Sequence, residues 1–202
     1  KVSGKQEHAI QNVYDSNERL IRLVNDILNL SRLETGKIKV EPEPFYINDI
    51  VKSVFTELEI KAKEKNIKLK FKESEYEIPE VHLDKAKIQN VIMNFIDNAI
   101  RYTKTGSIIV SIDPEPRRHP KKIHIAVKDT GRGMSKEEIE RLFQSFARGT
   151  AGMKTNTEGA GLGLYIARQF VAMHDGKVWA TSEGVGHGST FHAEVPLRVA
   201  AH

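Results

Sequence analysis

The chain has 202 residues, a net charge of +4 and 39% hydrophobic residues, which is typical of a globular protein with room for a sizeable core. The charge is too mild to indicate nucleic acid binding, and no apolar run is long enough to cross a bilayer. The absence of cysteine excludes disulfides and thiolate metal sites and fits a reducing compartment.

The first part of the chain has the pattern of one long amphipathic helix over residues 6–34, ended by Gly36. Its apolar and small residues alternate spacings of three and four, as in a heptad seam, and a second row repeats every seven residues. A stripe this wide is typical of a four-helix bundle. Since the sequence supplies one such helix, we expect a homodimer through it, followed by a stiff linker at residues 41–44.

From residue 44 onward, short strand patterns alternate with helical patterns. The expected strands are 44–47, 67–72, 107–112, 122–128, 177–182 and 189–195, with 107–112 and 122–128 forming a hairpin around a basic loop. The expected helices are one capped by Asn48 and running to about residue 65, then 83–102, a short one within 136–143, and 161–174. We therefore predict an α+β fold, a two-layer α/β sandwich whose mixed or mostly antiparallel sheet has helices on one face.

The segment MNFIDNAIRY, residues 93–102, places two asparagines on a helix that otherwise has the pattern of a buried element. Asparagine is a poor helix former because its amide competes for backbone hydrogen bonds. Asn94 and Asn98 lie one turn apart, opposite the apolar side of the helix. The other members of this polar face are Asn90, Asp97 and Arg101. Such a face is either a solvated surface or a ligand-binding one.

Two glycine motifs favour the ligand. DTGRGM, residues 129–134, follows a strand and combines a carboxylate at Asp129 with glycines that permit close backbone approach. GAGLGL, residues 159–164, opens a helix, where free amides and the helix dipole can bind phosphate. Each motif alone is weak, because the first also describes a simple turn and the second a common helix start. A dinucleotide fold would need a strand directly before the second motif, and a long loop precedes it.

Five segments together resemble the catalytic ATP-binding domain of sensor histidine kinases of two-component systems, a branch of the GHKL superfamily with the Bergerat-type fold. NFIDNAIRYT resembles the asparagine box, DTGRGM and GAGLGL the two glycine boxes, LFQSFARG the phenylalanine box, and GHGSTF a further glycine segment. The first helix resembles the second helix of the family's dimerisation and phosphotransfer bundle. The resemblance implies a bundle helix without its first helix, plus linker, at 1–43 and a catalytic domain at 44–202.

The resemblance also implies residue roles, with ATP and Mg2+ as the bound groups. Asn98 would be the magnesium ligand, Asn94 would position the ion or its waters, and Arg101 and Arg148 would meet phosphate; these four are the implied catalytic residues. Asp129 would accept a hydrogen bond from the adenine amino group. The whole implied ATP-binding set is Asn94, Asn98, Arg101, Tyr102, Asp129, Gly131, Gly133, Met134, Phe143, Phe146, Arg148, Gly159, Ala160, Gly161, Leu162, Gly163, Leu164 and Thr190. Residues from about 134 to 160 would form the ATP lid.

The implied activity is that of a protein-histidine kinase, which transfers the γ-phosphoryl group of ATP to a histidine and so feeds a phosphorelay to a response regulator. The family's acceptor histidine lies on the first bundle helix, and His8 lacks its surroundings. We therefore expect a piece that binds Mg-ATP without phosphorylating itself. It is expected in the cytoplasm, in a parent that can be membrane-anchored, without nucleic acid or membrane contact of its own.

Two other interpretations stay open. One is a non-catalytic module in which nucleotide gates binding or dimerisation. The other is a GHKL-type ATPase, which Asn94 disfavours: the ATP-hydrolysing relatives carry a glutamate there to activate water, and an amide cannot act as a general base at neutral pH.

Overall fold

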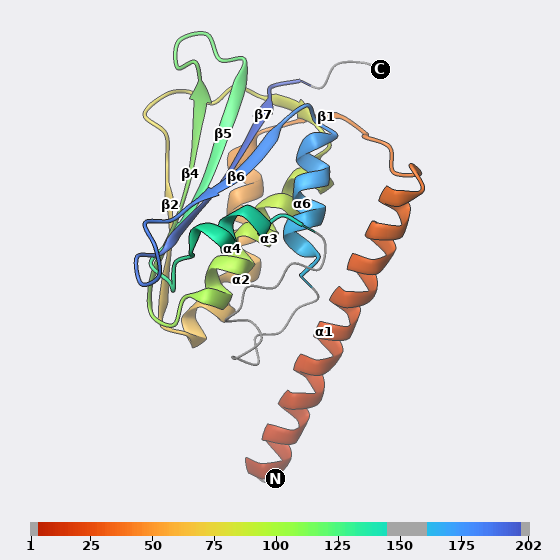
Figure 1. Ribbon diagram of the computed structural model, residues 1–202, viewed down its shortest axis with the longest axis vertical. Helices are drawn as coiled ribbons and strands as arrows, with labels where there is room; N and C mark the ends of the chain where they lie inside the picture. Colours follow the sequence, from red (N-terminus) through yellow and green to blue (C-terminus); the bar gives the residue numbers. More distant parts are fainter. Residues whose placement is uncertain (1–3, 145–160, 199–202) are drawn as a thin grey trace.

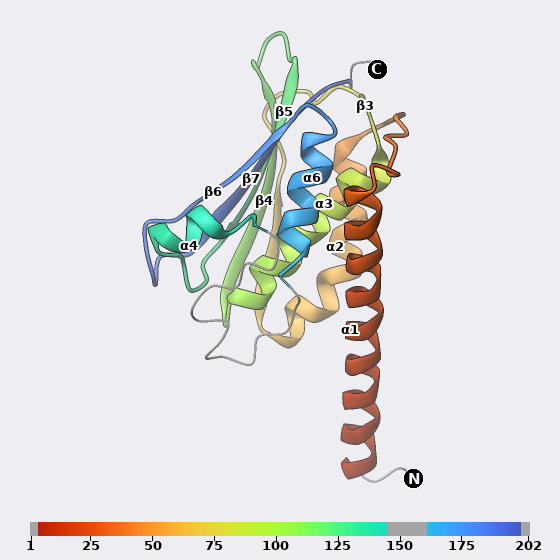
Figure 2. The ribbon, with the colours of Figure 1, turned by 45° about the vertical axis from the view of Figure 1, so that its right-hand side comes forward.

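The computed structural model describes residues 4–144 and 161–198 (Figure 1). The elements are α1 (Gly4–Glu34), β1 (Glu43–Phe45), α2 (Ile47–Glu64), β2 (Ile67–Lys72), β3 (Val81–Leu83), α3 (Lys85–Tyr102), β4 (Gly106–Glu115), β5 (Lys122–Asp129), α4 (Lys136–Arg141), α6 (Gly163–Ala172), β6 (Lys177–Thr181) and β7 (Ser189–Pro196). Helix α1 runs along one side of the α/β domain, and its N-terminal half extends beyond it (Figures 1 and 2). Among the described helices, none has both the length and the apolar composition needed to span a membrane.

The main sheet has the strand order β2-β4-β5-β7-β6. Strands β2 and β4 are parallel and the other pairs are antiparallel, so the sheet is mixed. The predicted hairpin is confirmed, with β4 and β5 paired from Ile108–Asp129 to Glu115–Lys122. Helices α2, α3 and α6 cover one face of the sheet (Figure 2). The predicted α+β sandwich with helices on one face is therefore confirmed.

The core lies between the sheet and these helices, and α3 is at its centre. Strands β4 and β5 bury every second side chain, because successive residues of a strand point to opposite faces. Helix α3 fits against them with one wholly apolar side, on which Phe95 packs against Phe191 of β7 at 5.7 Å between ring centroids. The fully buried residues of that side are Ile88, Val91, Ile92, Phe95, Ile96, Ala99 and Ile100.

The end of α1 and the start of α2 test two helix boundaries that were predicted from local sequence. Gly36 has φ +64°, and the amides of Gly36 and Lys37 donate to Leu33 and Arg32 at 3.1 and 3.0 Å, so the predicted glycine end of α1 is confirmed. The prediction that Asn48 caps α2 is wrong. The helix begins at Ile47 after Tyr46, because Ile47 and Ile50 must both be buried, and Asn48 Oδ1 is left buried with no partner among the described residues.

Helix α3 begins at Lys85 rather than near residue 83, because Val81–Leu83 pair with β1 and Asp84 forms the N-cap. Asp84 Oδ1 accepts from the Lys87 amide at 3.0 Å, and Oδ2 accepts from the Glu41 amide at 3.0 Å and from Lys87 Nζ. The Asp84 amide donates to Nε2 of the buried His174, also at 3.0 Å. The Asp84 carboxylate thus joins the linker to α3, and the Asp84 backbone amide adds a bond to His174, just after α6. Burial alone would raise the pKa of Asp84, but these hydrogen bonds outweigh it and the pKa is lowered.

We predict that Asp84→Ala destabilises the domain by about 1–2 kcal/mol, the usual cost of losing a helix cap. The lowered pKa means that the carboxylate stabilises the fold above its unfolded pKa of about 3.9 and loses this effect as pH falls through the folded pKa. The difference in unfolding free energy between wild type and variant, measured by urea denaturation, should therefore become smaller below about pH 4. The exposed Asp49→Ala is the matched control. A gap that stays constant from pH 7 to pH 3 would contradict this account.

Candidate functional site

Three motifs that are far apart in the sequence meet at the polar face of α3. Gly163, the first residue of α6, faces Asn94: a Cβ built on Gly163 would lie well inside van der Waals contact with Asn94 Oδ1. At the other end of the helix, a Cβ on Gly131 would lie 2.6 Å from the Tyr102 carbonyl oxygen and 2.7 Å from Asp129 Oδ1. The N-terminus of α6 and the turn after β5 therefore flank one side of α3.

Asp129 ends β5 and is only 3% exposed. Its Oδ1 accepts hydrogen bonds from the amide of Gly131 at 2.7 Å and from the amide of Ser189 at 3.3 Å. Oδ2 accepts none within the described part of the chain. Burial raises the pKa of Asp129, and the two backbone hydrogen bonds only partly oppose that rise. The site thus keeps one oxygen of a buried residue available for a donor on a ligand.

The two asparagines present carboxamides on the half-buried part of the same helix. Asn94 Nδ2 donates to the Asn90 carbonyl oxygen at 3.0 Å and to Asn90 Oδ1 at 2.7 Å. Asn98 makes no hydrogen bond among the described residues, so its oxygen is available. Amide oxygens are hard donors of the kind that Mg2+ takes together with substrate phosphates. The donor set of this face therefore fits a magnesium–phosphate ligand, with Asn98 as the residue that would hold the ion.

Arg101 lies on the same face but is engaged by a neighbour. Its guanidinium donates to Asp97 Oδ2 at 3.0 Å, and Asp97 is also paired with Lys61 of α2. The predicted contact of Arg101 with phosphate therefore requires sharing or releasing Asp97. Tyr102 accepts the Arg132 amide on its carbonyl oxygen at 3.1 Å, so the last turn of α3 holds the turn after β5.

The glycines of that turn permit close contact with a second loop, residues 182–188. Gly133 has φ +69°, and a Cβ there would collide with the Gly184 carbonyl oxygen. Gly188 has φ +71°, and a Cβ there would likewise collide with the Asp129 carbonyl oxygen. The Gly188 amide donates to the Gly131 carbonyl at 3.1 Å. Two loops from adjacent strands thus form one layer around Asp129, which no residue with a side chain at Gly133 or Gly188 would permit.

Some of the remaining predicted ATP-binding residues lie near this site, and others lie outside the described residues. Met134 is buried beneath the same turn, and its amide donates to Ser182 Oγ at 3.0 Å. Gly161 has φ +73° and precedes the buried Leu162, while Leu164 and Phe143 are half-buried and pack against the core. Phe146, Arg148, Gly159 and Ala160 lie outside the described residues.

The prediction for Thr190 needs correction. Strand β7 pairs Ser189 with Asp129 and Thr190 with Lys128, and alternate residues face opposite sides of the sheet. Ser189 is therefore the β7 residue beside the buried carboxylate, and Thr190 lies on the face without helices. Thr103, directly after α3, was also missed: it is fully buried next to Gly131, and its Oγ1 has no partner among the described residues. The register of β7 with β5 is the signal that separates Ser189 from Thr190.

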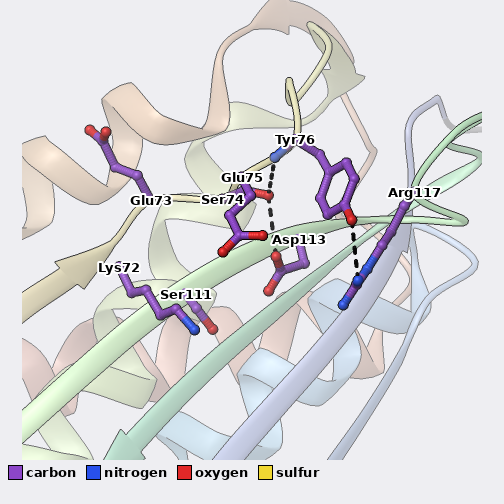
Figure 3. A pocket seen from close by; sticks show the side chains of 8 residues that line it. All are labelled: Lys72, Glu73, Ser74, Glu75, Tyr76, Ser111, Asp113 and Arg117. Atoms are coloured by element: carbon purple, nitrogen blue, oxygen red, sulfur yellow. Dashed lines mark hydrogen bonds between the residues drawn. The ribbon is translucent and has the colours of Figure 1, made fainter.

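A separate cavity of about 150 Å³ lies near the other end of β4, on the open face of the sheet (Figure 3). Two hydrogen bonds link four of its residues: Ser74 Oγ donates to Asp113 at 3.2 Å, and the Arg117 guanidinium donates to Tyr76 Oη at 3.3 Å. It is lined by Lys72, Glu73, Ser74, Glu75, Tyr76, Ser111, Asp113 and Arg117, and none of these belongs to the site at α3.

Comparison with known proteins identifies relatives of this fold and site. Residues 83–199 match the family described as histidine kinase-, DNA gyrase B-, and HSP90-like ATPase. Over 191 residues the chain is 31% identical to the non-motile and phage-resistance protein of Caulobacter vibrioides, covering 93% of this chain and 22% of that protein.

Solved structures give the same result. The structure of full-length ShkA in complex with AMPPNP superposes on all of this chain and on 41% of its own, with a TM-score of 0.81 and 27% identity. The catalytic domain of the histidine kinase ThkA matches with a TM-score of 0.66 and 28% identity, over 78% of this chain and 99% of that domain. The chain therefore has the fold of a histidine kinase ATP-binding domain, and it spans well under half of its first full-length relatives.

We predict that Asp129→Asn weakens ATP binding about tenfold or more, measured by isothermal titration calorimetry, without lowering the melting temperature. The amides of Gly131 and Ser189 both require an acceptor at Oδ1, so the new amide nitrogen would face the ligand and oppose an amino group there. Removing a buried carboxylate with a raised pKa does not cost stability at neutral pH, because that raised pKa marks a charged form disfavoured by folding. Asp113→Asn on the open face is the control. Unchanged ATP affinity would exclude Asp129 from base recognition.

Proposed function

Because the chain belongs to the family of histidine kinase-, DNA gyrase B-, and HSP90-like ATPases, we propose that it binds Mg-ATP and transfers the γ-phosphoryl group to a histidine of a partner bundle helix. The acceptor passes the phosphoryl group to a response regulator. Residues 1–43 are then a helix of the dimerisation and phosphotransfer bundle with its linker, and residues 44–202 are the catalytic domain.

The observation that carries this proposal is the contact between Gly163 and Asn94 Oδ1. It brings a helix N-terminus, whose free amides and dipole attract phosphate, to the carboxamides suited to magnesium. Asp129, at the other end of the same face, offers Oδ2 to the adenine amino group. A triphosphate between these groups has its base at Asp129 and its charged tail at Asn94, Asn98 and Gly163 of α6.

Each residue has a separate task in the proposed reaction. Asp129 selects the base, Asn98 holds the metal, Asn94 orients it, and Arg101 neutralises phosphate charge. A bound Mg2+ would supply charge neutralisation on the phosphate oxygens. The acceptor imidazole nitrogen forms a bond to the γ-phosphorus as the bond to the β-bridging oxygen breaks, leaving ADP. Catalysis then rests on positioning and electrostatics, because phosphoryl transfer asks for little covalent chemistry from the protein.

Transfer to a protein is favoured over hydrolysis by the chemistry of Asn94. Its carboxamide cannot take a proton from water at neutral pH, so it gives the site no general base at the position where a carboxylate would activate water. The same amide can orient a metal or its water ligands without adding negative charge beside the phosphates.

Helix α1 supports the proposed homodimer. Its large apolar residues form an exposed stripe at Ile10, Val13, Leu20, Ile21, Val24, Ile27 and Leu28. Exposed apolar rows of this length mark a protein contact surface, and their heptad spacing fits helices of a second copy. We place the whole assembly in the cytoplasm, where ATP and response regulators meet.

The proposal predicts phosphotransfer in trans. Incubated with labelled ATP and magnesium, the chain should stay unlabelled alone and should label a supplied bundle that carries the acceptor histidine. The label should be acid-labile and alkali-stable, as expected for phosphohistidine. Stable label on the chain alone would contradict the assignment of the acceptor to another segment. Steady ATP hydrolysis without transfer would instead favour the ATPase interpretation.

A second prediction concerns Asn98→Ala. The substitution should reduce magnesium-dependent ATP affinity by at least roughly tenfold, while the fold persists because alanine is the better helix former. Calorimetry with and without magnesium measures the effect, and circular dichroism checks the fold. The exposed Asn25→Ala on α1 is the control and should bind as wild type. Wild-type affinity in Asn98→Ala would remove this residue from the metal site.

A further inference from the structure

Asn90 makes the closest described contact with the Asn94 side chain, and the proposed function gives it no role. It lies one turn before Asn94 on α3, half-buried on the same polar face. Its side-chain oxygen accepts from Asn94 Nδ2 at 2.7 Å, and its backbone carbonyl accepts from the same nitrogen at 3.0 Å.

These two contacts determine which atom of Asn94 faces the site. A backbone carbonyl can only accept a hydrogen bond, so the atom 3.0 Å from it must be the Asn94 nitrogen and not its oxygen. The orientation therefore follows from hydrogen-bonding chemistry. With the nitrogen directed back along α3, Asn94 Oδ1 is directed forward.

The forward direction is toward the N-terminus of α6. A Cβ at Gly163, the first residue of α6, would collide with Asn94 Oδ1. Within the described ranges no side chain caps that helix end. Its first amides and partial positive charge favour an oxygen ligand or a phosphate beside it. Reversing the carboxamide would place an NH2 group there, next to other donors and without lone pairs for a metal or its waters.

We propose that Asn90 is a positioning residue that fixes the Asn94 carboxamide with its oxygen toward the bound metal–phosphate group. The inference rests on the proposed function for the identity of that group, and on the Asn90 contacts alone for the orientation. Amide pairs at this helical spacing also occur on helix surfaces, where they add slightly to helix stability. A positioning role differs from that case because it changes the metal dependence of binding.

The orientation can be tested without nucleotide. Two-dimensional ¹⁵N–¹H spectra resolve the Asn94 Nδ2 protons, which Asn94→Asp identifies by removing them. In Asn90→Ala these protons should shift toward the values of an exposed amide, because one of the two acceptors is lost. In Asn90→Asp, which keeps an acceptor oxygen, they should stay near their wild-type positions. Unchanged Asn94 protons in Asn90→Ala would overturn the inference.

The functional consequence is tested by ATP affinity with and without magnesium. Asn90→Ala should lower the magnesium-dependent gain in affinity by roughly 3- to 10-fold, the effect of one hydrogen bond, and leave metal-free binding near wild type. Gln89→Ala, the preceding half-buried amide of α3, is the matched control and should keep the wild-type gain.

The outcomes separate this inference from the proposed function. If magnesium raises the ATP affinity of Asn90→Ala as much as it raises that of the wild type, the positioning role is overturned. An equal loss with and without magnesium also overturns it, since a merely structural role would act in that way. If the wild-type chain itself shows no magnesium-dependent affinity for ATP, the proposed function fails and the metal-facing role fails with it. The amide spectra then still decide the orientation of Asn94.

Discussion

The position of every side chain on the polar face of α3 depends on the complete burial of the opposite side of the helix. Residues such as Ile92, Phe95 and Ile96 are locked between the sheet and the neighbouring helices, so the helix cannot rotate about its axis without exposing them. The packing of these apolar residues therefore fixes where Asn94 and Asn98 lie along the helix and in which direction their side chains point. The unfavourable helix propensity of asparagine is a small local cost compared with this packing.

The same helix also fixes its two ends to different parts of the chain. Asp84 joins the start of α3 to the linker and to the end of α6. At the other end, the carbonyl oxygen of Tyr102, the last residue of α3, accepts the Arg132 amide in the turn after Asp129. The distance between the Asp129 carboxylate and the carboxamides of Asn94 and Asn98, to which we assign base and metal binding, is thus set by a single rigid element. A change in the linker that displaces Asp84 acts on the N-terminal cap of the helix that carries Asn94 and Asn98. The linker after α1 and the α/β domain are therefore joined through a hydrogen-bonded cap as well as through the covalent chain.

The sequence predicted those features that repeat locally. Alternation in β2, β4 and β5 and the apolar side of α3 were sufficient, because a half-buried element must repeat with its own period. Features set by distant pairing were not predictable. Ser189 and Thr190 are adjacent, and only the register of β7 against β5 decides which one reaches Asp129. Asn48 had the chemistry of a cap, but burial of Ile47 moved the helix start by two residues.

The charges at the two ends of the site differ for a physical reason. At the proposed base end a buried carboxylate is unfavourable for folding, as the raised pKa of Asp129 indicates, yet an ionised carboxylate offers an amino group only acceptor oxygens. At the proposed phosphate end a carboxylate in place of Asn94 would repel the triphosphate and could activate water. A neutral amide avoids both effects, but it is asymmetric, with an oxygen on one side and an NH2 group on the other. Its use therefore requires something to fix its orientation, and Asn90 meets that requirement within the same helix.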